Sequence, residues 1–121
     1  MSTGRQNSAL GAYGERVAAR HLADEGLVLL DRNWRCDAGE IDLVLRDGDV
    51  LVFCEVKTRN GTAYGHPLEA VDGVKTDRLV LLGQRWMEAH GVRAAQVRYD
   101  MVGVVRSLRG AAEVEHVRGL G

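Results

Sequence analysis

The chain has 121 residues, of which 45% are hydrophobic and 27% are charged, and its formal net charge at pH 7 is −1. These values predict one globular domain with its own hydrophobic core, and they exclude a protein that coats nucleic acid through bulk positive charge. No hydrophobic run is long enough to span a membrane, and we expect no signal peptide, no membrane partner and a cytoplasmic location.

The predicted elements alternate between helices and strands. Residues 1–6 are small and polar and predict a disordered tail before a domain over residues 7–106. Periodicity and turn signals predict a helix from residue 7 or 8 to 25, strands over 28–34, 39–45 and 50–57, a loop over 58–67, a helix from about 68 or 72 to 90, and a strand over 96–105. In the C-terminal segment 107–121, residues 114–117 could form a short edge strand. The order α-β-β-β-α-β indicates an α/β fold with a mixed sheet and helices packed on it.

Two of the predicted strands each carry an acid and are joined by a short turn. Asp42 lies in the first of them and Glu55 follows the apolar part of the second, and an Asp-Gly pair at residues 47–48 favours a tight hairpin. Because side chains alternate along a strand, Glu55 and Lys57 share one face. The hairpin is therefore expected to bring Asp42 close to both of them.

Charges at the end of strongly apolar strands need a physical reason, because charged groups are costly to bury unpaired. One explanation is an exposed ion pair, worth roughly 0–1 kcal/mol. The other is a site for a hard cation such as Mg²⁺, which prefers carboxylate and carbonyl oxygens and needs only one or two acidic ligands. Such an ion activates water and stabilises charge on a phosphoryl oxygen, and a nearby lysine can add to that stabilisation. Asp42, Glu55 and Lys57 therefore indicate a metal-dependent phosphodiester site slightly ahead of an ion pair.

Further charged residues each have two interpretations. Glu15 flanks the apolar stripe of the first helix, and from that helix alone a solvated glutamate is favoured. Glu40 would either support the acid cluster from its own strand or lie solvated at the strand end. Lys75 and Arg78 of the second predicted helix either extend into solvent from its apolar stripe or meet phosphate groups. Arg59 closely follows the acid-bearing strand, which favours contact with a substrate.

The order of the motifs resembles the YraN family, a bacterial family of small proteins with a restriction-endonuclease-like fold. The resemblance covers about residues 7–105 and is carried by Gly14-Glu15 and Ala18, Gly39-Glu40-Ile41-Asp42-Leu43, Phe53-Cys54-Glu55-Val56-Lys57-Thr58-Arg59, Tyr64-Gly65-His66-Pro67, Glu69-Ala70-Val71, Lys75 and Arg98-Tyr99-Asp100. It implies an α-β-β-β-α-β core with a mixed central sheet flanked by helices. The wider similarity is to the PD-(D/E)xK nucleases, which include archaeal Holliday-junction resolvases.

The resemblance also implies a role for individual residues. Asp42, Glu55 and the backbone carbonyl of Val56 would bind Mg²⁺ or Mn²⁺. Lys57 would position or activate the attacking water, and Glu15 would support the metal shell from the helix. The implied function is that of a metal-dependent endonuclease acting on DNA, with branched or damaged DNA as the expected substrate. The alternative is a non-catalytic nucleic-acid-binding or adaptor module that retains the site residues. Because related junction-cleaving enzymes act as dimers, a homodimer is also considered.

Overall fold

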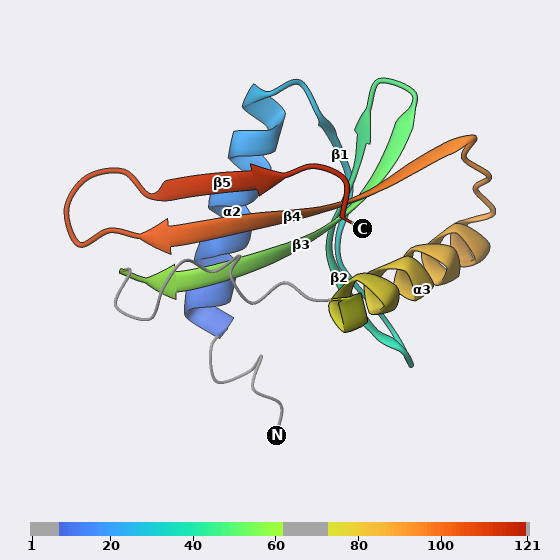
Figure 1. Cartoon of the computed structure of the whole chain (residues 1–121), viewed down its shortest axis with the longest axis horizontal. Helices are drawn as coiled ribbons and strands as arrows, with labels where there is room; N and C mark the ends of the chain where they lie inside the picture. The colour runs from blue at the N-terminus through green and yellow to red at the C-terminus, as the bar shows by residue number, and fades with distance from the viewer. Residues whose placement is uncertain (1–7, 62–72, 121) are drawn as a thin grey trace.

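A five-stranded sheet between two helices forms the body of the protein (Figure 1). The computed structural model describes residues 8–61 and 73–120. The elements are α2 (Ser8–Asp24), β1 (Val28–Cys36), β2 (Gly39–Asp47), β3 (Val50–Asn60), α3 (Gly73–His90), β4 (Gln96–Arg106) and β5 (Glu113–Val117). This order confirms the predicted α/β core and the predicted short edge strand near the C-terminus. Neither of the helices in the described ranges is long and apolar enough to cross a membrane.

The strands follow one another across the sheet in the order β1-β2-β3-β4-β5. The pair β3–β4 is parallel, and the three other pairs are antiparallel. A parallel pair needs a long crossover connection, and α3 lies in that connection. The predicted hairpin is present as β2–β3, with Asp47 opposite Val50 and Gly48 in the turn at a φ of 59°, a conformation that favours glycine. The sheet is therefore mixed, as expected.

Alternation of apolar side chains gives the sheet two buried faces. On β3, Val52 and Cys54 belong to the cluster that contains Ala18 and Leu22 of α2. The intervening residue Phe53 belongs to a separate cluster. That second cluster contains Leu51, Leu79, Leu82 and Trp86, so it is the one covered by α3. The two helices consequently lie on opposite faces of the sheet, and the strand ends between them remain available for a site.

The strand β3 is longer than predicted. Thr58–Asn60 were expected in a loop, but they continue β3 and pair in parallel with β4, where Thr58 lies opposite Val104 and Asn60 opposite Arg106. The prediction was wrong because β4 runs on as far as Arg106 and supplies a partner that local sequence does not reveal. Residues 62–67 of the predicted loop and residues 68–72 at the start of the predicted second helix lie outside the described residues.

A glycine sets the distance between α2 and the sheet. A Cβ atom added at Gly14 would lie 1.7 Å from Thr58 Oγ1 and 2.8 Å from Thr58 Cβ. Rotation of the threonine side chain cannot relieve the second contact, because Cβ is fixed to the backbone of β3. The absence of a side chain at Gly14 thus allows the helix to approach β3 closely, and Glu15, the next residue, is brought to the same end of the sheet.

Gly14→Ala is expected to lower the free energy of unfolding by about 1–3 kcal/mol, the usual cost of overpacking a close contact. The matched control is Gly11→Ala on the same helix, where an added Cβ meets nothing within 4 Å. There the gain in helix propensity should raise the free energy of unfolding by roughly 0.5–1 kcal/mol. Equilibrium unfolding in urea measures both changes. If both variants shift stability equally, the close approach does not constrain the helix.

Candidate functional site

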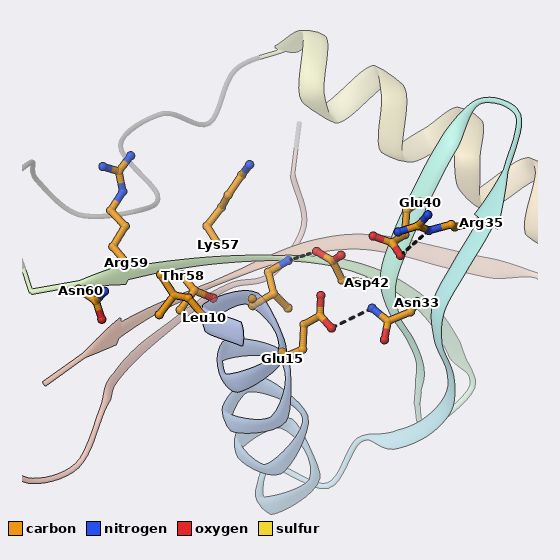
Figure 2. A pocket seen from close by; sticks show the side chains of 13 residues that line it. Leu10, Glu15, Asn33, Arg35, Glu40, Asp42, Lys57, Thr58, Arg59 and Asn60 are labelled. Carbon is orange, nitrogen blue, oxygen red and sulfur yellow. Dashed lines mark hydrogen bonds and ion pairs between the residues drawn. The ribbon is translucent and has the colours of Figure 1, made fainter. Parts of the chain in front are cut away.

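An open cleft of about 900 Å³ lies between the start of α2 and the strands β1 to β3 (Figure 2). Its lining comprises residues from these four elements: Leu10, Gly11, Ala12, Glu15, Asn33, Arg35, Glu40, Asp42, Val56, Lys57, Thr58, Arg59 and Asn60. The structure therefore gathers four of the predicted site residues from two strands and a helix, namely Glu15, Asp42, Val56 and Lys57. The cleft also includes Glu40 and Arg59 from the sequence-based predictions.

The cleft opens where β2 and β3 separate. Their pairing ends with Leu43 opposite Cys54, and beyond this point the backbone N–H of Val56 donates a hydrogen bond to Asp42 Oδ2 at 2.7 Å. A side chain has thus taken the place of a backbone acceptor. The N–H and C=O groups of one residue in a strand point to the same side. The carbonyl oxygen of Val56 therefore faces the gap that Asp42 occupies.

An interruption of regular strand geometry places Asp42 in this gap. In an uninterrupted strand, residues two apart share a face. Ile41 packs in the cluster under α3, whereas Leu43 packs in the cluster under α2, so the alternation of β2 breaks between them. The neighbouring strand is irregular at the same level, because Asn33, which lies between the paired residues Arg32 and Trp34, has a φ of 50°. Asparagine tolerates this left-handed conformation better than most residues.

The environment of Asp42 disfavours its charged form. The pKa of the Asp42 carboxyl rises from an ordinary value of 3.8 to about 7. Burial is the largest cause. The hydrogen bond from Val56 N–H acts in the opposite direction, and the charges of Glu15, Glu55 and Glu40 raise the pKa further. Several carboxylates thus lie close enough to repel one another, and a bound positive charge would relieve that repulsion.

Glu55 carries a buried oxygen that lacks a hydrogen-bond donor. Its Oε2 atom accepts no hydrogen bond from any described residue. Lys57 Nζ lies 3.6 Å from the same oxygen, which is close enough for attraction between charges but too long for a hydrogen bond. Buried polar atoms in native proteins are usually satisfied, so an exception calls for an explanation such as a bound ion. Glu55 itself is not among the residues that line the cleft.

Two polar pairs hold the other acids of the cleft. Asn33 Nδ2 donates a hydrogen bond to Glu15 Oε1 at 2.8 Å, and Arg35 Nε donates one to Glu40 Oε2 at 3.2 Å. Figure 2 shows Glu15 and Asn33 pointing toward each other beside Asp42. Neither strand residue was predicted from the sequence. The signal that could have found Asn33 was a turn-forming residue within a predicted strand, near its end.

The oxygen atoms around Asp42 limit which metal ion the site could hold. Among residues 8–61 and 73–120, no group of three or more histidine, cysteine, aspartate and glutamate side chains is arranged to hold one. A site would therefore rest on Asp42 and Glu55, with the Val56 carbonyl and water as further ligands. This all-oxygen set fits Mg²⁺ or Mn²⁺, because such hard cations keep several waters and need few carboxylates. The buried Glu55 Oε2 atom, which accepts no hydrogen bond from a described residue, is available as such a ligand.

The remaining predicted residues divide into two groups. Lys57 and Arg59 line the cleft and extend from β3 to the side opposite α2 (Figure 2). Arg78 is exposed on α3 and is not part of the cleft lining. Lys75 lies in the first turn of α3, and its side chain falls outside the described part of the structure.

Asp42→Asn should raise the free energy of unfolding at pH 8, measured in urea with a metal chelator present. The wild-type carboxyl has a pKa near 3.8 when unfolded and about 7 when folded, so stability falls as pH rises between these values. A shift of this size corresponds to at most about 4 kcal/mol, which the neutral amide would recover.

The advantage of Asp42→Asn should shrink at pH 5, where the folded carboxyl of the wild type is largely protonated. Asp49→Asn is the matched control, because it removes the same charge from an exposed position in the β2–β3 turn. It should change stability by less than about 0.5 kcal/mol at either pH. An Asp42→Asn effect that is equal at pH 5 and pH 8 would argue against the raised pKa.

Comparison with known proteins places the chain in a family. The model of the uncharacterised protein family UPF0102 matches residues 14–104. A UPF0102 protein from a Nocardioides strain is 62% identical over 113 residues, which cover 93% of this chain and 91% of that protein. A UPF0102 protein from Beutenbergia cavernae is 56% identical over 117 residues, covering 97% of this chain and 99% of that protein. The chain therefore belongs to the uncharacterised protein family UPF0102, which is the YraN family that its motifs resemble.

Proposed function

We propose that this protein is a metal-dependent endonuclease that hydrolyses phosphodiester bonds in DNA, with Mg²⁺ or Mn²⁺ as its cofactor. The observation that carries the proposal is the buried Glu55 oxygen, which has no donor among the described residues and lies near Asp42 and Lys57 where β2 and β3 separate. A purely structural ion pair would leave neither an unsatisfied oxygen nor a carboxyl with a pKa raised to about 7. Branched or damaged DNA is the proposed substrate class, and the cytoplasm is the proposed location.

Four residues in and beside the cleft have distinct parts in the proposed chemistry. A divalent ion bound to Asp42 and Glu55 would lower the pKa of a water molecule and stabilise negative charge on the phosphoryl group. Lys57 carries three N–H donors on a half-exposed ammonium group, with which it can orient the attacking water and stabilise the pentavalent transition state. Glu15, held by the hydrogen bond from Asn33, would support the metal shell by accepting a hydrogen bond from a metal-bound water.

The edge of β3 offers a path for the phosphate backbone. The N–H of Val56 points toward β2, and by strand alternation so do those of Thr58 and Asn60. No described residue of β2 pairs with β3 beyond Cys54, so these two N–H groups face the cleft. Backbone N–H groups and Arg59, which also lines the cleft, are common ligands of DNA phosphates. This supports a nucleic acid over a small phosphate ester as the substrate.

Asp42→Asn and Glu55→Gln should each weaken binding of Mg²⁺ or Mn²⁺ at least about tenfold, because each removes a charge that the cation needs while nearly conserving volume. Isothermal titration calorimetry at pH 8 measures the affinity, and circular dichroism checks that the fold is retained. Asp49→Asn in the exposed turn serves as the control for a lost surface charge. Wild-type affinity in both site variants would show that the ion, if bound, lies elsewhere.

Lys57→Ala should separate catalysis from metal binding. Metal affinity should stay the same or rise, because a nearby positive charge is lost, whereas cleavage should fall by about 10²–10³-fold. The assay compares duplex, single-stranded, flap and four-way-junction DNA with Mg²⁺ or Mn²⁺ present. Arg93→Ala, which removes an exposed cation outside the cleft, is the matched control. DNA binding without cleavage of any of these structures by the wild-type protein would favour the non-catalytic adaptor.

A further inference from the structure

A second hollow lies on the other side of α2 from Asp42. It has a volume of about 530 Å³, and Tyr13, Arg16, Arg20 and Asp24 of α2 line it together with Val114 of β5. We call this hollow the α2–β5 groove. None of these residues lines the cleft that contains Asp42, so the groove is a separate surface whose role the proposed chemistry does not explain.

The groove carries two arginines that pair with no acid in the described part of the chain. Arg16 and Arg20 are both exposed and line the groove one helical turn apart, about 6 Å along the axis. Neither forms an ion pair or hydrogen bond with another described residue. Like charges four residues apart on a helix destabilise it slightly. A pair of guanidinium groups left in this arrangement is better explained by an anionic ligand than by the stability of the helix.

The groove is joined to the cleft by the ends of β3 and β4. Asn60, at the end of β3, lines the cleft and pairs with Arg106 at the end of β4. The guanidinium group of Arg106 lies over the Tyr13 ring, 5.3 Å from its centroid, and Tyr13 lines the groove. Neighbouring strands are only about 5 Å apart. Polar and cationic groups therefore connect the cleft to the groove, from Asn60 through Arg106 to Tyr13.

We propose that the α2–β5 groove is a second binding surface for the phosphodiester backbone of the DNA whose reactive segment occupies the cleft, an inference that rests on the function proposed above. Guanidinium groups match phosphate in charge and in hydrogen-bond geometry. Asp24 is the only acidic group among the described residues that line the groove, and it lies one turn beyond Arg20 at the end of α2. The groove thus holds the flanking part of the nucleic acid, with Arg16 and Arg20 in contact with successive phosphates.

The test is fluorescence anisotropy with labelled duplex DNA in a chelating buffer, where no metal-dependent cleavage occurs. Arg16→Gln/Arg20→Gln should weaken binding of long duplexes and reduce the slope of log affinity against log salt by about two units, because each lost phosphate contact contributes about 0.9. The loss should be similar for all sequences. The control Arg46→Gln/Arg93→Gln removes the same net charge from exposed positions outside both hollows and should change the slope little.

Duplex length provides a second measurement, in which the wild-type protein alone already reports how much DNA the two hollows cover. Wild-type affinity should rise with length until both hollows are covered, and the affinity of Arg16→Gln/Arg20→Gln should stop rising at a shorter length. Equal slopes and equal length dependence in the groove variant and the control would overturn the groove proposal while leaving the endonuclease proposal standing. Failure of the wild type to bind DNA of any length would overturn both. Binding of an acidic peptide through Arg16 and Arg20, with unchanged DNA binding, would assign the groove to a protein partner instead.

Discussion

The hydrogen bond from Val56 N–H to Asp42 Oδ2 is the interaction on which the cleft depends. An antiparallel ladder that continued past Cys54 would satisfy the same N–H with a backbone carbonyl and would close the gap between β2 and β3. A carboxylate reaches further than a carbonyl, so the strands can separate while the donor stays satisfied. Because the Asp42 side chain accepts this hydrogen bond in place of a backbone carbonyl, its second oxygen and the carbonyl of Val56 remain at the opening, where both can serve as ligands.

A second buried acid shows how this fold satisfies a carboxylate when the role is structural. Asp100 is fully buried on β4, where Arg98 binds both of its oxygens and His116 Nε2 lies 2.7 Å from Oδ2. Burial alone would raise the pKa of Asp100, but these hydrogen bonds hold it below its ordinary value. Among the residues that the structure describes, no comparable set of cations surrounds Asp42 and Glu55, and the pKa of Asp42 is raised. This contrast within one sheet supports the proposal that Asp42 and Glu55 bind a cation.

Local sequence patterns predicted most of the fold. The features that they missed depend on contacts between residues that are far apart in the sequence. The Asp-Gly turn and the apolar strands predicted the hairpin that carries Asp42, because register in a tight hairpin follows from the turn. From helix periodicity alone Glu15 was favoured as a solvated residue, yet it receives a hydrogen bond from Asn33, 18 positions away. The side chain of His116 on β5 is only 4% exposed, and its two ring nitrogens lie 2.7 Å from Asp100 and 2.9 Å from Glu25, which is 91 positions away. No local pattern contains these partners.

The helix α2 relates the two hollows of the molecule through its own geometry. Successive residues of a helix differ in direction by about 100°, so Glu15 faces the cleft while Arg16 faces the groove. The contact between Gly14 and Thr58 fixes the height of the helix above β3 and thereby positions both side chains at once. In the two proposals above, the acid cluster binds a cation and the arginines bind an anion. A nucleic acid with a divalent ion on one phosphate and with its next phosphates free would occupy both sites as a single ligand. The opposite charges at adjacent positions of α2 are therefore consistent with one extended substrate.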